Sequence, residues 1–185
     1  MATVHPRLMM WHLMNETRVA MVSFRKTDGR NLSQPMTLFN KEIPRSVLVE
    51  EHLEQQHQLY FFVRAEGELC RSVEAGHTEV GVTFSKHSAD LYAYIEGRAS
   101  ISNDRKLLEQ LWTPTAEAWF NGYQDPQLRL LLVHGESADV WHNTHSATQQ
   151  WGTSPKKPWA QVMKRRCTPK TTYNCKRQPY LSLYQ

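Results

Sequence analysis

The chain has 185 residues, of which 40% are hydrophobic and 10% aromatic, a composition typical of a folded globular protein and not of a disordered one. Its longest apolar runs, Leu59–Val63 and Leu130–Val133, are far shorter than the roughly 20 residues that cross a bilayer, so no membrane association is expected. The first residues lack a basic segment leading into an apolar one, so no secretory signal is predicted and the expected location is cytoplasmic.

The net charge of +4 is unevenly distributed. Residues 144–185 hold eight Lys and Arg and no acidic residue, which leaves 14 of the 22 basic residues beside all 18 acidic ones in the rest of the chain. We therefore predict one domain at 1–145 and a basic extension at 146–185 that can be disordered and is dispensable for folding. A basic extension can neutralise nucleic-acid phosphates, but a solvated tail is the simpler interpretation, and nucleic acid is an expected partner only through this tail.

The first part of the domain predicts a helix followed by a hairpin. Residues 5–13 have apolar side chains at helical spacing, and the apolar run 19–22 predicts a strand that is followed by a turn at 27–30. The second strand of the hairpin is expected over 31–38. Pro35 within it has no amide donor, which favours an edge of the sheet, where a ligand can approach.

The rest of the domain alternates short strands with helices. A short helix at 46–55 is expected after Pro44, Asp104 is a candidate N-cap, and Pro114 suits the first turn of a helix. The further predicted elements are strands at 58–63, 80–84, 91–97 and 128–133 and helices at 65–75 and 105–112. About six strands with few helices predict a mostly β, or α+β, small barrel.

Catalytic signatures are absent from the sequence. It has no phosphate-binding glycine loop, no dinucleotide fingerprint, no nucleophile elbow and no zinc-protease motif, so no catalytic residue is assigned. The three cysteines, Cys70, Cys167 and Cys175, are odd in number and match no ligand spacing. Free thiols and no metal site are therefore predicted.

Several short phrases keep a common order and spacing over residues 7–142. They are Ser33–Met36, Tyr60–Phe62, Val80–Phe84, Tyr94–Gly97, Asp104–Arg105, Leu111–Trp112, Ala118–Phe120, Asp125–Pro126, Leu131–Val133 and Trp141. Together they resemble the general stress protein branch of the pyridoxamine 5'-phosphate oxidase-like flavin proteins. The resemblance implies a six-stranded split β-barrel with flanking short helices, which forms a homodimer and binds FMN at the subunit interface.

The resemblance also implies an FMN site and one of two roles, an FMN-dependent oxidoreductase or a flavin carrier. The candidate cofactor-binding residues are Gln34, Pro35, Met36, Thr37, Phe62, Val63, Trp119 and Phe120 from the resemblance, and Arg64 and Arg71 from their spacing in the sequence. The two aromatics at 119–120 either wall the flavin or belong to the core and the dimer contact. Pyridoxamine phosphate oxidase activity itself is disfavoured, because the residues that would bind the substrate phosphate are not found.

The sequence departs from the family pattern at the expected phosphate site. Gln34 stands where the family has Arg, and Leu69 stands where it has Lys. A phosphate dianion in a partly buried cleft needs charge-assisted donors. Arg64 and Arg71 are near enough in sequence to substitute. The alternative is a flavin-free split barrel that serves as a binding or structural dimer module.

Overall fold

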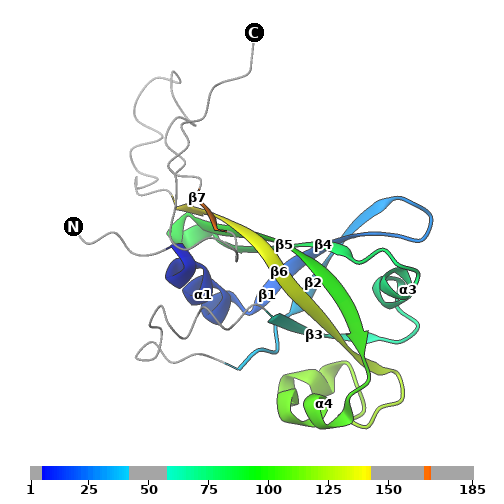
Figure 1. Cartoon of the computed structure of the whole chain (residues 1–185). Coiled ribbons are helices and arrows are strands. Elements are labelled where there is room, and N and C mark those ends of the chain that lie inside the picture. The colour runs from blue at the N-terminus through cyan, green and yellow to red at the C-terminus, as the bar shows by residue number, and fades with distance from the viewer. Residues whose placement is uncertain (1–5, 42–57, 143–164, 168–185) are drawn as a thin grey trace, which may run out of the picture.

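The computed structural model describes residues 6–41, 58–142 and 165–167 (Figure 1). The helix expected at 46–55 lies outside these residues. Within them, no helix combines the length and the apolar character needed to cross a membrane.

One antiparallel sheet forms the body of the molecule. Its strands are β1 (Val19–Arg25), β2 (Asn31–Thr37), β3 (Gln58–Arg64), β4 (Glu79–Lys86), β5 (Leu91–Ser102), β6 (Leu128–His142) and β7 (Arg165–Cys167). The six long strands lie in the order β2-β1-β4-β5-β6-β3, and the short β7 pairs with β6. The helices are α1 (Pro6–Thr17), α3 (Glu68–Glu74) and α4 (Arg105–Leu111), with 3-10 turns η2 (His87–Ala89) and η3 (Pro114–Ala118). Among the described residues, six long strands in one curled sheet and three α-helices confirm the predicted split barrel.

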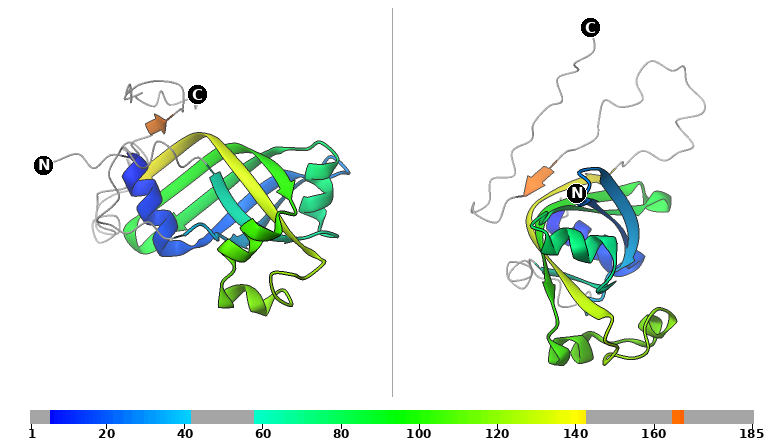
Figure 2. Two further views of the ribbon diagram at one scale, coloured as in Figure 1. Left: turned by 60° about the horizontal axis from the view of Figure 1, so that its bottom comes forward. Right: turned by 90° about the vertical axis from the view of Figure 1, so that its right-hand side faces the viewer.

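The sheet curls until its two edge strands meet at one point (Figure 2). Leu38, directly after β2, forms a single antiparallel bridge with Phe61 of β3, and it is the one β2–β3 bridge among the described residues. Pro35 lies on β2, at the edge of the sheet, as its missing donor predicts. The barrel is therefore closed at this bridge and split beyond it, between the rest of β2 and the end of β3.

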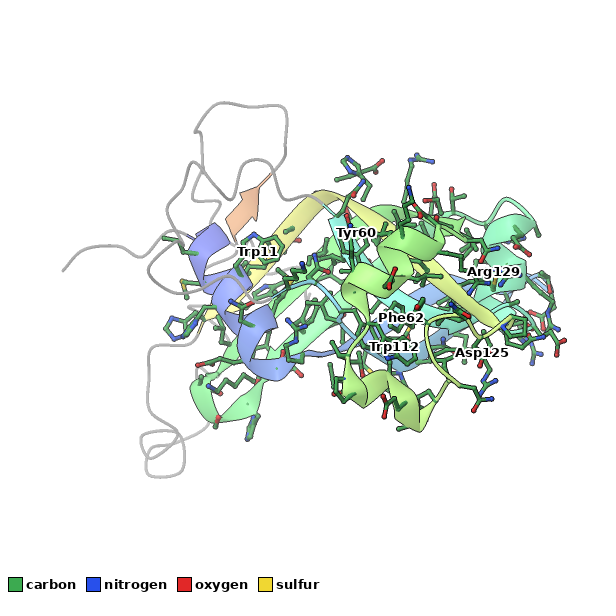
Figure 3. All side chains as sticks on the ribbon, turned by 90° about the horizontal axis from the view of Figure 1, so that it is seen from below. Trp11, Tyr60, Phe62, Trp112, Asp125 and Arg129 are labelled. Carbon is green, nitrogen blue, oxygen red and sulfur yellow. The ribbon has the colours of Figure 1, made fainter. Side chains whose placement is uncertain are left out.

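The two faces of the sheet bury separate cores. The inner face packs against α1 and α3, and Trp11, Leu13, Leu69 and Val73 from these helices are almost fully buried there. The outer face of β3 and β6 packs against α4 and η3 in a second cluster: Phe39, Phe62, Leu108, Leu111, Ala116, Phe120, Leu128 and Leu130. Figure 3 shows Phe62 and Trp112 close together in this second cluster, and Trp11, which belongs to α1, away from them.

Strands β5 and β6 are much longer than their apolar runs predict. The prediction ended them at Gly97 and Val133, but they continue to Ser102 and His142. In these extensions polar residues are interspersed with apolar ones, so no continuous apolar run marks the strand. The backbone pairing of β5 with β6 nevertheless continues through them. The register shifts between Glu96 and Gly97 of β5, which pair with Ser137 and Gly135, so the extra residue is Glu136 and the bulge lies in β6.

Three predicted helices have different bounds or types in the structure. The helix predicted at 65–75 starts only at Glu68, because a turn precedes it, in which the Gly67 amide donates to the Arg64 carbonyl over 2.9 Å. The helix predicted at 105–112 ends at Leu111; its N-cap is confirmed, since Asp104 accepts from two backbone amides at 3.0 and 3.3 Å. The segment after Pro114 is a 3-10 turn and not an α-helix.

Candidate functional site

The split between β2 and β3 is the candidate site, and its backbone geometry follows from the bridge that closes it. The Phe39 amide donates to the Tyr60 carbonyl over 2.8 Å, and the Tyr60 amide donates to Asn40 Oδ1 over 2.8 Å. Both polar backbone groups of Tyr60 therefore point away from β6. Because these groups alternate along a strand, those of Phe62 point to the same side, toward the split. The end of β3 thus offers main-chain donors and acceptors at this opening.

The β2 side of the split carries the predicted residues 34–37 with different exposures. Met36 is buried in the inner core, Pro35 is exposed, and Gln34 and Thr37 are half-buried. Gln34 makes one weak internal contact, from Nε2 to the sulfur of Met36 at 3.6 Å. Gln34 and Thr37 are the polar side chains that this edge contributes.

The predicted β3 residues divide in the same way. Phe62 and Val63 are buried on opposite faces of the sheet, in the second and the first core respectively. Phe62 stacks on Phe39 with ring centres 4.0 Å apart. Their side chains are therefore core groups, and a ligand in the split would meet their backbone and the exposed Arg64.

Arg64 connects the end of β3 to the segment after η3. Its Nη2 donates to the Trp119 carbonyl over 2.7 Å, and its guanidinium carbon lies 5.3 Å from the centre of the Phe120 ring. A guanidinium has five N–H donors in a planar fork. The contact with Trp119 uses one of them, so Arg64 can hold an anion without releasing the segment.

The two adjacent aromatics at 119–120 have opposite environments. Phe120 is 8% exposed and meets Phe62 edge-on, with ring centres 6.3 Å apart. Trp119 is 64% exposed. Phe120 is therefore part of the second core, while the indole of Trp119 is available for stacking.

A buried carboxylate holds the turn through which the chain returns from Trp119 to β6. Asp125 is 7% exposed and accepts from the Asn121 amide over 3.0 Å and from the Gln127 amide over 2.8 Å. These two hydrogen bonds, with Arg64 and Arg105 nearby, lower the pKa of Asp125 below its ordinary value. Sequence analysis did not assign this role to Asp125, although the Asp-Pro pair marks a turn.

Arg71 does not share the environment of Arg64. It lies on α3 and pairs with Glu68 over 3.1 Å. Glu68 also accepts from Thr27, in the turn between β1 and β2, over 3.3 Å. Leu69 on the same helix is 2% exposed and belongs to the inner core. Position 69 therefore cannot supply a cation to the split without burying a charge, and Arg64 is the stronger of the two candidate phosphate ligands.

The arrangement suits a ligand with a planar ring and one anionic group. Trp119 offers an exposed aromatic face, Arg64 offers a fork of donors, and the edges of β2 and β3 offer main-chain polar groups. Among the described residues, no group of His, Cys, Asp or Glu side chains could hold a metal ion. FMN, with its flat flavin and terminal phosphate, matches these donors in type.

Comparison with known proteins connects this geometry to one family. The family described as "Pyridoxamine 5'-phosphate oxidase like" matches residues 7–157. General stress protein 26 of Bacillus subtilis is 36% identical over 47 residues, which cover 25% of this chain and 34% of that protein. The match thus spans about a third of the length of this curated relative.

Solved structures share the fold at low sequence identity. The general stress FMN/FAD binding protein of Xanthomonas citri superposes with a TM-score of 0.61 at 24% identity and covers 85% of this chain and 99% of its own. General Stress Protein 26 of Bacillus anthracis has a TM-score of 0.60 at 18% identity, over 74% and 94% of the two chains. At these identities the similarity shows a common fold.

Proposed function

The chain belongs to the pyridoxamine 5'-phosphate oxidase-like family, and on this premise we propose that it binds FMN in the split between β2 and β3. The observation that carries the proposal is the position of Arg64, which is exposed at the end of β3 and fixed beside Trp119. Arg64 would bind the phosphate, and Trp119 would stack on the flavin. The backbone around Gln34–Thr37 and Phe62 would hold the ribityl chain or the ring.

Bound flavin would supply hydride transfer, and the protein would supply position and charge. We infer an oxidoreductase or a flavin carrier of the general stress type, since a relative of this fold is described as an FMN/FAD binding protein. The unit responsible would be residues 1–145. A reducing compartment such as the cytoplasm fits the free thiol of buried Cys70.

The proposal includes a homodimer. Among the described residues four large hydrophobic side chains are exposed, and two of them, Val19 at 50% and Met21 at 42%, lie on the outer face of β1, next to the edge strand β2. Pro35 of β2 lies opposite Met21 in the register. An apolar strip beside an edge strand is a surface that a second copy would cover.

One observation favours a second candidate function. The positions where the family pattern has cations hold Gln34, which is neutral, and Leu69, which is buried. A chain with one remaining phosphate ligand would bind FMN weakly. The second candidate is therefore the flavin-free dimer module.

Titration of the purified chain with FMN, followed by quenching of flavin fluorescence, separates the two functions. Riboflavin, which has the flavin ring but no phosphate, is the matched control. FMN binding well above riboflavin binding supports the proposed phosphate contact. Equal binding of FMN and riboflavin would contradict the proposed contact between Arg64 and the phosphate. No binding at high micromolar FMN would favour the flavin-free module.

A further inference from the structure

Two turns of the barrel carry residue pairs that can form a succinimide ring, Asp28-Gly29 and Asn121-Gly122. In such a pair the amide nitrogen of the glycine attacks the side-chain carbonyl carbon of the residue before it. Glycine favours this reaction because it has no Cβ to crowd the new five-membered ring. Both glycines have a left-handed backbone, with φ of 85° and 89°. The two turns therefore have the same chemistry available, and they differ in what holds the reacting groups.

At Asp28-Gly29 both reacting groups are engaged. The Gly29 amide donates to the Lys26 carbonyl over 2.9 Å. The Asp28 carboxylate accepts from Arg30 Nη2 over 2.7 Å and from Lys26 Nζ over 3.1 Å, and these contacts, led by that of Arg30, hold the pKa of Asp28 well below its ordinary value. Ring closure at a carboxyl group must expel water, which an ionised carboxylate does poorly. This pair is thus held unreactive.

At Asn121-Gly122 the reacting groups are free. In the part of the chain that the structure describes, neither the side-chain amide of Asn121 nor the backbone amide of Gly122 has a hydrogen-bond partner. Asn121 is exposed, and a methyl group built on Gly122 would meet no atom within 4 Å. The side chain of Asn121 can therefore turn toward the Gly122 nitrogen without displacing a neighbour.

We propose that Asn121 is a site of spontaneous deamidation in the folded protein. The Gly122 nitrogen forms a bond with Cγ of Asn121, the Cγ–Nδ2 bond breaks, and ammonia leaves with the proton of the Gly122 amide. Water then opens the succinimide at one of its two carbonyls, which gives aspartate or isoaspartate at position 121. The only co-reactant is water, and Asn121-Gly122 is the one Asn-Gly pair in the sequence.

The product alters the turn that follows Trp119. The backbone amide of Asn121 donates to Oδ2 of the buried Asp125 over 3.0 Å, so the new carboxylate arises close to an existing one, and like charges repel. In the isoaspartate form the main chain also runs through Cβ and Cγ of residue 121, which lengthens it by one carbon. Both changes should loosen the turn and weaken the contact of the Trp119 carbonyl with Arg64. The modification itself does not depend on flavin binding.

Peptide mapping of the full chain, aged at mildly alkaline pH either folded or in urea, tests the reaction. The tryptic peptide 107–129 contains Asn121 and no other Asn, and the peptide 27–30 contains Asp28-Gly29. Deamidation should raise the mass of the first peptide at similar rates in the folded and the unfolded chain. Isoaspartate in the second peptide should form much more slowly in the folded chain. Asn121→Gln is the matched control, because its longer side chain would have to close a six-membered ring, and it should stay unmodified.

Hydrogen–deuterium exchange tests the consequence for the turn. The deamidated chain, separated by its added negative charge, should exchange the amides of residues 119–125 faster than the fresh parent by about tenfold or more, because local opening sets the exchange rate. The aged Asn121→Gln chain should not differ from its fresh form, and the peptide covering 128–134, which pairs with β3, reports that the barrel stays folded. Deamidation about tenfold or more slower in the folded than in the unfolded chain would overturn the proposed site, since the reaction would then require local opening. Unchanged exchange at 119–125 after deamidation would overturn the effect on the turn.

Discussion

Nη2 of Arg64 lies 2.7 Å from the carbonyl oxygen of Trp119, so one side chain ties the end of β3 to a segment 55 residues later. The same guanidinium lies over the ring of Phe120, 5.3 Å from its centre. A cation and an exposed indole are thereby fixed side by side at the split, which is the basis for the first prediction.

Replacing Arg64 with Met should weaken FMN binding between about tenfold and a hundredfold, because a hydrogen bond to a charged group contributes about 1.5–3 kcal/mol. Arg71→Met is the matched control and should change the Kd little, since Arg71 pairs with Glu68 on α3. Flavin fluorescence quenching measures both. A larger loss in Arg71→Met than in Arg64→Met would transfer the phosphate site to α3.

The chain should be a dimer in solution, because the exposed strip of Val19 and Met21 adjoins an edge strand. Light scattering on the chain, and on a version truncated after Asn143, should give twice the monomer mass in both cases. Met21→Lys should shift the equilibrium toward monomer, whereas Gln110→Lys, on an exposed position of α4, should not. A monomer at micromolar concentration would refute the interface.

Leu69→Lys should destabilise the fold and not tighten FMN binding. Leu69 is 2% exposed in the inner core, and an uncompensated buried charge costs about 3–5 kcal/mol. Leu69→Met conserves volume and should cost less than about 1.5 kcal/mol. Urea unfolding measures both free energies, and a Leu69→Lys variant as stable as the parent would show that the side chain can turn outward.

Gly97→Ala should lower the free energy of unfolding by about 1–3 kcal/mol, the usual cost of overpacking. A methyl group at this position would lie 2.3 Å from the backbone oxygen of His134, which cannot move without disturbing β6. At Gly81 the nearest atom would be the Tyr94 hydroxyl, at 2.6 Å. Gly81→Ala should therefore become tolerable when Tyr94 is replaced by Ala, and no second-site change of a side chain should rescue Gly97→Ala.

Asp125→Asn should lower the melting temperature most at neutral pH. The native pKa of Asp125 is lowered, so its carboxylate stabilises the fold above the unfolded pKa of about 3.9, and this stabilisation is lost as pH falls through the native pKa. The difference between parent and variant should therefore shrink below pH 4. Glu117→Gln, an exposed change of the same charge, should show a small difference at neutral pH. A difference for Asp125→Asn that is constant with pH would contradict the argument.

Local sequence pattern predicted most strands but not how they combine. The apolar runs at 19–22 and 58–63 indicated β1 and β3, and Pro35 indicated an edge. The split itself depends on the bridge between Leu38 and Phe61, which no periodicity encodes. The different exposures of Trp119 and Phe120 could not be predicted from the sequence either, because the 3-10 turn before them decides which of the two adjacent rings faces the core.

The hydrogen bonds of Asn40 bear on where residues can be inserted into this chain without destabilising the barrel. Its side chain donates from Nδ2 to the Gln58 carbonyl over 2.7 Å and accepts from the Tyr60 amide, so it joins the two ends of the connection between β2 and β3. The free energy of closing a loop grows only with the logarithm of its length, by about 0.6 kcal/mol for each doubling. With its ends fastened by Asn40, this connection is the place where evolution or an engineer can insert residues at little cost to the barrel.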